Sequence, residues 1–223
     1  MPYRRTENVV RRLAEREQTI LAAATAMAAE GGMAAVQIAD VAARAGIAAG
    51  TVYRYFPSKT DLVAELVAAV AGRELSAMAA AGDAAPGPLS ALAACIATFA
   101  ARALHERRLA WAVIGEPVDA QVDAMRLDFR QSLAAELEAR IKTAIDGRHL
   151  ADLDAAVAAP AIVGALMEGL LGPLAPSHDE AASGRREAVQ GATLLALRAL
   201  GMVDARARGL VAQCALPIAD KKS

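Results

Sequence analysis

Apolar side chains recur along the chain at helical spacing, and no stretch alternates between apolar and polar positions. Ile20, Ala24 and Met27 follow the three- and four-residue intervals that place side chains on one face of a helix. Gly31 comes next, and glycine commonly ends a helix. The pattern predicts a first helix over residues 15–30.

Two short helices are predicted next, over residues 37–45 and 48–55. Gly46 lies between them and permits the positive φ of a sharp turn, and Pro57 ends the second helix because proline lacks a backbone N–H. Ser58 then opens a long fourth helix with a carboxylate three residues later, which approximates a capping box. A longer helix followed by two short ones around a glycine turn is typical of a helix-turn-helix.

The rest of the chain is also predicted to be helical, and the composition agrees. Alanine is abundant and aromatic residues are 3% of the sequence, which favours helices over strands. The predicted helices cover residues 58–81, 89–107, 109–115, 118–145, 150–171 and 185–200, with one further short helix after residue 202. We therefore expect an all-α protein with two parts. Residues 1–60 form a three-helix helix-turn-helix domain with a basic N-terminal arm, and residues 61–223 form a larger helical domain.

Charge is divided unevenly between these parts. Residues 1–60 carry a net charge of +3 and residues 61–223 carry −4. A basic head on an acidic body predicts that the head alone meets a polyanion such as DNA. Arg4 and Arg5 belong to a basic N-terminal arm. This arm is either a disordered terminus or a segment that follows the DNA and contacts its phosphates.

A cytoplasmic location is expected from what the chain lacks. Its two cysteines are far apart, which is typical of a reducing compartment. The first 18 residues carry charge throughout, so no secretion signal is expected. The longest uncharged apolar run, residues 155–167, has 13 residues, whereas a membrane-spanning helix needs roughly 20.

The second short helix carries side chains suited to a DNA groove. Gly50 permits close approach of the phosphate backbone, and the hydroxyls of Thr51 and Tyr53 are hydrogen-bonding groups for phosphates or bases. Arg54 is able to bond a guanine edge with two donors. Lys59 opposes the dipole at the start of the fourth helix, an unfavourable position unless an anion lies nearby.

The segment Ala39–Leu62 resembles the signature of TetR-like (tetracycline-repressor) regulators. The matching positions are Asp40, Val41, Ala42, Ala45, Gly46, Gly50, Thr51, Tyr53, Tyr55, Phe56, Ser58, Lys59 and Leu62. The resemblance implies DNA-binding residues, which are Arg4, Arg5, Arg44, Gly50, Thr51, Tyr53, Arg54, Tyr55 and Lys59. Gln37 and Ala48 depart from the pattern because they replace hydroxyl residues that would cap the two short helices.

The resemblance also implies a homodimer on double-stranded operator DNA, a small and lipophilic effector, and no metal or other cofactor. Candidate effector-pocket residues are Cys95, Phe99, His105, Trp111, Met125, Phe129 and Met167, although apolar residues at this spacing more often belong to plain core, which is the favoured interpretation for each one taken singly. Small or apolar residues on two helices are candidates for the dimer interface, namely Ala161, Ala165, Gly169, Leu194 and Leu197.

Two other function classes are alternatives to a DNA-binding regulator. A ligand-binding or scaffolding protein with a degenerate head would explain the missing caps. An enzyme would need a catalytic constellation, and the sequence shows no nucleophile elbow, phosphate loop or histidine spacing that binds metal. A ligand-responsive repressor fits the residues best, and activation in place of repression stays open.

Overall fold

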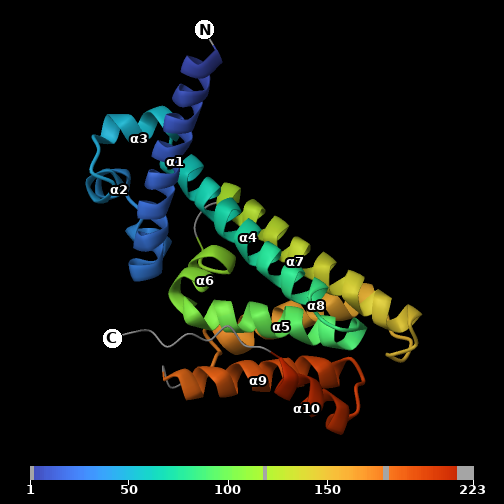
Figure 1. Cartoon of the computed structure of the whole chain (residues 1–223). Helices are drawn as coiled ribbons and strands as arrows, with labels where there is room; N and C mark the ends of the chain where they lie inside the picture. Colours follow the sequence, from blue (N-terminus) through green and yellow to red (C-terminus); the bar gives the residue numbers. More distant parts are fainter. Residues whose placement is uncertain (1–2, 118–119, 178–180, 215–223) are drawn as a thin grey trace.

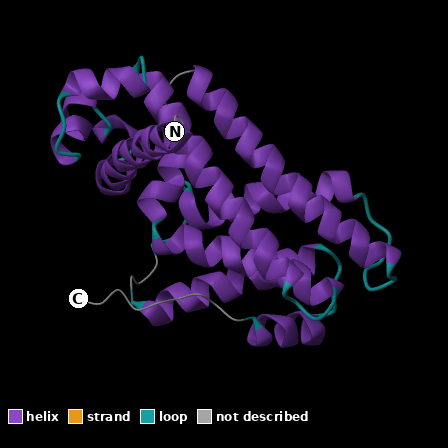
Figure 2. Ribbon diagram, turned by 45° about the horizontal axis from the view of Figure 1, so that its top comes forward, coloured by secondary structure: helices purple, strands orange, loops and turns teal. Residues whose placement is uncertain are grey.

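The computed structural model describes residues 3–117, 120–177 and 181–214, with side chains from Val9 onward. Within these residues there are helices and loops but no strand, which confirms the all-α prediction (Figures 1 and 2). The helices are α1 (Tyr3–Gly31), α2 (Ile38–Arg44), α3 (Ala49–Tyr55), α4 (Lys59–Asp83), α5 (Pro88–His105), α6 (Arg107–Ile114), α7 (Ala120–Asp146), α8 (Ala155–Leu166), α9 (Ala182–Ala199) and α10 (Asp204–Gln213).

Helices α1, α2 and α3 enclose a small core of their own at the N-terminal end of the molecule (Figure 1). Ile20 of α1, Val41 of α2 and Val52 of α3 are each 0% exposed and belong to the same packed cluster. Burying three such side chains together fixes the angle between the short helices, neither of which is long enough to be stable alone.

The turn between α2 and α3 depends on Gly46. Its φ is +66°, a left-handed conformation that favours glycine. Its N–H donates to Ala43 O at 3.1 Å, and the N–H of Ile47 donates to Ala42 O at 3.0 Å. This pair of hydrogen bonds is a Schellman motif, which ends α2 and reverses the chain.

Helix α1 begins much earlier than residue 15, where the sequence placed its start. It starts at Tyr3 and projects past α2 and α3 (Figure 1). Val9, Val10 and Leu13 on this extension are 53%, 60% and 48% exposed, so packing does not hold it. The reason is local, since arginine and glutamate are good helix formers and Arg11 pairs with Glu15 one turn later at 3.7 Å.

Helix α4 leads from the small core into the larger part of the molecule. Ser58 caps it, because its Oγ accepts a hydrogen bond from the N–H of Asp61 at 3.1 Å, as the sequence predicted. The helix then packs against α5 and α7. A rigid helix shared by the two parts makes their relative position sensitive to anything that moves α4.

Helix α5 is the centre of the larger part and lies against α4, α7 and α9. By length and composition alone it is apolar enough to cross a membrane, but 72% of that apolar stretch is buried inside the fold. The core position of α5 accounts for its composition, because a helix enclosed on several sides needs apolar residues all round.

Helix α8 is shorter than the predicted helix over residues 150–171. Asp154 caps its start by accepting from the N–H groups of Ala156 and Val157 at 3.0 and 3.3 Å, so residues 150–154 precede the helix. Pro160 lies inside α8 on its exposed side, and the last turn, Met167–Leu171, is π-helical. A π turn re-aims the residues that follow it.

Candidate nucleic-acid interface and effector cavity

The outer face of α3 is free of the core. Val52 points inward, whereas Tyr53 is 52% exposed and Arg54 is exposed as well. Neither Tyr53 nor Arg54 has a hydrogen-bond or ion-pair partner among the residues that the structure describes. A hydroxyl and a guanidinium are therefore available on a short helix, in the way that a major-groove reader requires.

Two features let another molecule approach this face closely. A Cβ built on Gly50 would have no atom within 4 Å, so the start of α3 is open. Thr51 and Lys59 are half-buried, and each lies in the first turn of its helix, where backbone N–H groups attract an anion. Tyr55 is also half-buried and packs against the core, so part of its ring serves stability.

Arg44 does not point freely outward. Its Nη1 and Nη2 donate to the two carboxylate oxygens of Glu30 at 2.7 and 2.6 Å. The hydrogen bonds lower the pKa of Glu30 and raise that of Arg44. Because both side chains are exposed, such a pair contributes little to stability.

The helix starts that the sequence left without caps are uncapped in the structure. Gln37 and Ala48 precede α2 and α3, and neither side chain accepts a hydrogen bond from the helix. Gln37 instead donates to Ala34 O at 2.9 Å. The first N–H groups of α3 are left for water or for an anion that approaches along the helix axis.

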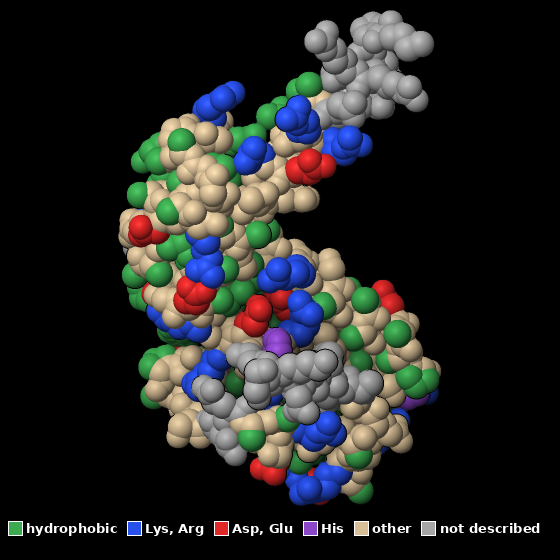
Figure 3. Space-filling view, turned by 60° about the vertical axis from the view of Figure 1, so that its left-hand side comes forward, with side chains coloured by type: hydrophobic (Ala, Val, Ile, Leu, Met, Phe, Trp, Pro, Cys, Tyr) green, Lys and Arg blue, Asp and Glu red, His purple; other side chains and the backbone are tan. Residues whose placement is uncertain are grey.

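Basic side chains gather along the projecting part of α1 (Figure 3). Arg11, Arg12 and Arg16 are all exposed there. Arg4 and Arg5 lie in the first turns of α1, but their side chains fall outside the described residues, and their role stays a prediction.

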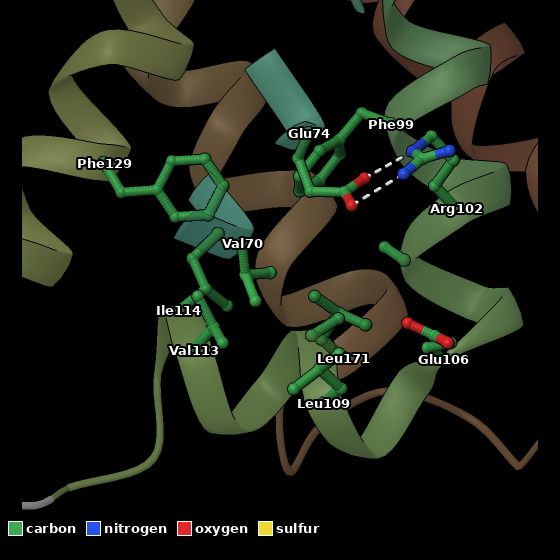
Figure 4. Close-up of a pocket in the computed structure, with 12 residues that line it drawn as sticks. Val70, Glu74, Phe99, Arg102, Glu106, Leu109, Val113, Ile114, Phe129 and Leu171 are labelled. Carbon is green, nitrogen blue, oxygen red and sulfur yellow. Dashed lines mark hydrogen bonds and ion pairs between the residues drawn. The ribbon is translucent and has the colours of Figure 1, made fainter. Parts of the chain in front are cut away.

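A second feature is a small cavity within the larger part, between α4, α5, α6, α7 and the π turn (Figure 4). Its volume is about 30 Å³. Most of its lining is apolar, and the residues are Val70, Glu74, Phe99, Arg102, Ala103, Glu106, Leu109, Ala110, Val113, Ile114, Phe129 and Leu171. Apolar walls with a few polar groups are typical of small-molecule sites.

The polar groups of the cavity form one pair and one separate carboxylate. Arg102 Nε and Nη2 donate to Glu74 Oε2 and Oε1 at 2.6 and 2.9 Å, and Figure 4 shows this two-pronged contact. Hydrogen bonding to Glu74 and the charges of Glu74 and Glu106 raise the pKa of Arg102. The pair joins α4 to α5 at the cavity wall.

Helix α6 faces the cavity on one side and α1 on the other. Arg108 Nη2 donates to Gly31 O at 3.1 Å, and Glu116 Oε2 accepts from the N–H of Met33 at 3.2 Å. Arg108 and Glu116 also pair with each other at 3.3 Å. We call these contacts the latch between Arg108, Glu116 and the backbone of residues 31–33. The latch joins α6 and the loop that follows it to the backbone at the end of α1.

Arg126 of α7 holds the end of α6. Its side chain is 2% exposed, and it donates to the carbonyl oxygens of Ala112, Val113 and Glu116. Burial lowers the pKa of Arg126, and the nearby carboxylate of Asp123 opposes that effect. The last carbonyl groups of a helix lack partners within it, so a buried guanidinium satisfies them and fixes the latch.

Only some of the seven residues predicted for the pocket line the cavity. Phe99 and Phe129 line the cavity, whereas the other five, Cys95, His105, Trp111, Met125 and Met167, do not. Cys95 is buried beside the end of α4, where its Sγ donates to Met78 O at 3.3 Å and burial raises the pKa of the thiol to about 11. The half-buried Trp111 packs its ring against Gly115.

His105, Met125 and Met167 also have places outside the cavity lining. His105 is half-buried in the last turn of α5, Met125 packs against the core, and Met167 is 8% exposed at the start of the π turn. The sequence analysis missed Glu74, Arg102, Arg108, Glu116 and Arg126. A charged residue is predicted to face solvent when no partner for it is evident nearby in the sequence. The partners of these five residues are mostly distant in sequence, so no local pattern marked them.

A third feature is an exposed apolar face on α8 and α9. Ala161, Ala165 and Gly169 are exposed along it, and their place in a dimer interface stays a prediction. Between the two helices lies a groove of about 260 Å³ whose lining is entirely small or apolar: Ala165, Leu166, Gly169, Leu170, Ala188, Gly191, Ala192, Leu195 and Ala196.

One residue predicted for this face needs correction. Leu197 is 0% exposed and packs inside the subunit, and Leu194 is half-buried. Leu195, which is 61% exposed, takes the outward position. The phase of the helix explains this, because Leu194, Leu195 and Leu197 cannot all lie on one face.

Among the described residues there is no group of three or more His, Cys, Asp or Glu side chains arranged to hold a metal ion. The pair of Glu74 and Arg102 is mutually satisfied rather than poised for proton transfer.

The N-terminal part of the chain is similar in sequence to known proteins. Residues 20–66 match the N-terminal domain of the tetR family of bacterial regulatory proteins. Over 62 residues the chain is 55% identical to the HTH-type transcriptional repressor KstR of Mycobacterium tuberculosis. That match covers 28% of this chain and 26% of KstR, so it spans about a quarter of the relative's length.

The whole fold also has solved counterparts. The regulator FadR of Bacillus subtilis, in complex with stearoyl-CoA, has a TM-score of 0.67 at 19% identity, and the match covers 83% of this chain and 98% of that one. RolR in complex with resorcinol has a TM-score of 0.65 at 21% identity, covering 93% and 100%. At these identities the likeness is one of fold.

Proposed function

We propose, because residues 20–66 match the tetR family of bacterial regulatory proteins, that the chain is a ligand-responsive transcriptional repressor. The protein binds a pseudo-palindromic operator as a homodimer and is released by a small, lipophilic effector. The observation that carries the proposal is the free outer face of α3, where Tyr53 and Arg54 are exposed on a helix that Val52 anchors.

DNA recognition divides among these side chains by chemistry. Arg54 reads a base edge, since a guanidinium offers two donors to guanine. Thr51, Tyr53, Tyr55, Lys59 and, once it leaves Glu30, Arg44 bind phosphates and fix the position of α3 in the groove. Gly50 admits the backbone, and Arg4 and Arg5 extend the contact beyond α3.

The exposed face of α8 and α9 is the proposed dimer interface, with Leu195 in the outward position. Two such helices from each subunit form a four-helix contact, and small residues such as Ala165 and Gly169 permit close approach. The dimer then presents two copies of α3 to major grooves one turn apart, about 34–36 Å.

The effector enters the cavity between α4, α5 and α6. At about 30 Å³ the cavity holds a water molecule or two, whereas ligand sites occupy about 300–1,000 Å³. Binding therefore separates the helices around it. Helix α6 carries that movement to the head through the latch, and α4 carries it directly, so the spacing of the two α3 helices changes and DNA affinity falls.

The remaining assignments follow from this role. Residues 1–60 are the DNA-binding domain, and residues 61–223 bind the effector and dimerise. The protein works in the cytoplasm, away from the membrane, and is a regulator rather than an enzyme. Dependence on a metal or other cofactor is not part of the proposal.

The test is binding to the DNA that flanks the protein's own coding region, measured by fluorescence anisotropy over a salt series. We expect Lys59→Ala to weaken binding to every sequence and to reduce the salt slope by about 1. Arg54→Ala should relax sequence preference by about 1–3 kcal/mol. Arg186→Ala, which removes an exposed arginine of α9, is the matched control. Wild-type binding by both head variants would overturn the assignment of α3.

A further inference from the structure

The polar wall of the cavity restricts the chemistry of the molecule that it accepts. We propose that the effector is an apolar molecule whose head group donates hydrogen bonds, a hydroxyl or an ammonium, and that Glu74 and Glu106 receive it. The same wall excludes a carboxylate head. This inference rests on the proposed function, because it names the ligand class of the effector site.

Arg102 is the guanidinium in the lining, and it is already engaged. Two of its nitrogens donate to the two carboxylate oxygens of Glu74 at 2.6 and 2.9 Å. The side chains of Arg102 and Glu74 are 33% and 17% exposed, so the pair is partly withdrawn from water. A carboxylate ligand would be left with the remaining N–H groups of Arg102, beside the negative charges of Glu74 and Glu106. In a place partly withdrawn from water, the repulsion between like charges opposes such binding.

Glu106 adds a second negative charge to the same wall. Its carboxylate has no hydrogen-bond or ion-pair partner within the described part of the chain. The lining thus holds two carboxylates and one guanidinium, with a net charge of −1. Carboxylate oxygens only accept hydrogen bonds, and each has a further lone pair to offer. A donor head satisfies these oxygens, whereas an anionic head is repelled by them.

The apolar lining determines which effector body fits the cavity. Phe99 and Phe129 turn their rings to the cavity, and Val70, Ile114 and Leu171 complete that side (Figure 4). Aromatic rings pack well against other rings and compact hydrocarbons. Since the cavity is small before a ligand enters, a compact body requires the least separation of the helices.

The experiment compares four probes that share one body and differ in the head: 4-ethylphenol, 4-ethylbenzylamine, 4-ethylbenzoate and ethylbenzene. Binding to the full chain is measured by isothermal titration calorimetry at pH 7. We expect 4-ethylphenol and 4-ethylbenzylamine to bind about tenfold more tightly than ethylbenzene, and 4-ethylbenzoate to bind more weakly than ethylbenzene. Comparing the affinities of the phenol and the amine shows whether the site prefers a neutral or a charged hydrogen-bond donor.

Two variants show whether these carboxylates are responsible. Glu106→Gln should remove most of the advantage of the amine over ethylbenzene. Glu74→Gln releases Arg102, so the affinity for 4-ethylbenzoate should rise about tenfold. Glu65→Gln removes an exposed carboxylate from the same helix, outside the cavity, and should change nothing. Circular dichroism shows that each variant is folded.

Three results would overturn the inference: 4-ethylbenzoate binding to the wild type as tightly as 4-ethylphenol, no measurable binding of 4-ethylphenol, or an unchanged order of affinities in both cavity variants. Failure of the proposed function has a different signature. If 4-ethylphenol binds as expected but the protein never binds DNA, the head-group assignment holds and the repressor proposal fails.

Discussion

Gly32 is the residue at which the head meets the body most tightly. Its φ is +73°, and a Cβ built there would lie 2.5 Å from both Arg108 Cζ and Glu116 Oε2. A side chain at this position would therefore strain the backbone and push the latch apart. Gly46 has a similar φ, but open space surrounds it.

Replacing these glycines should separate the cost of a strained backbone from the cost of displacing the latch. We expect Gly32→Ala to lower the free energy of unfolding by about 2–4 kcal/mol, because the left-handed backbone and the displaced latch both count against it. Gly46→Ala should cost about 1–2 kcal/mol from the backbone alone. Gly72→Ala, in an exposed part of α4 with nothing nearby, should stabilise by about 0.5–1 kcal/mol. Urea denaturation measures all three, and equal losses for Gly32 and Gly46 would argue against the latch.

Among the elements, α3 is a short helix that its own residues stabilise only weakly. It has seven residues, and its start lacks a side-chain cap. Ala48 already has the extended backbone of a capping residue, with φ −73° and ψ 144°. The core contact of Val52 holds the helix in place of a cap.

Supplying the missing cap should stabilise the head. Ala48→Ser places an oxygen where it can accept from the first free N–H groups of α3, which is worth about 1 kcal/mol. Ser58→Ala, which removes the cap of α4, should cost about the same. Thermal unfolding followed by circular dichroism would show shifts in opposite directions. No gain from Ala48→Ser would mean that the start of α3 is already satisfied.

At the scale of the whole molecule, the face of α8 and α9 is an apolar surface that the described residues leave exposed. Leu195, which is 61% exposed, lines its groove beside exposed Ala165 and Gly169. Exposed apolar grooves of this kind are typical of surfaces that meet another protein.

A charge in this groove should separate the subunits. We expect the wild type to sediment as a dimer and Leu195→Glu as a monomer, since an unpaired carboxylate would be buried at the contact. DNA affinity should fall as well, because one α3 helix then acts alone. Leu174→Glu, at an 82% exposed loop position, should leave the dimer intact. Sedimentation velocity gives the answer, and a dimeric Leu195→Glu variant would place the interface elsewhere.

Much of the head could be predicted from the sequence because its signals are local. Gly46 ends α2 through hydrogen bonds that span five residues or fewer, and Ser58 caps α4 through a residue three positions away. Val52 and Tyr53 differ in burial because neighbouring residues on a helix point in different directions. Spacing along the chain decides such features, so the sequence alone was enough to predict the all-α fold and the exposed face of α3.

The packing of distant helices determines which partners the charged side chains find. Arg102 and Glu74 are 28 residues apart, and Glu116 is 83 residues from Met33, whose backbone N–H donates to it. No local pattern marks such pairs, because their energy depends on packing that brings distant helices together and removes water between them. The cavity wall, the latch and the outward phase of Leu195 all belong to this second class.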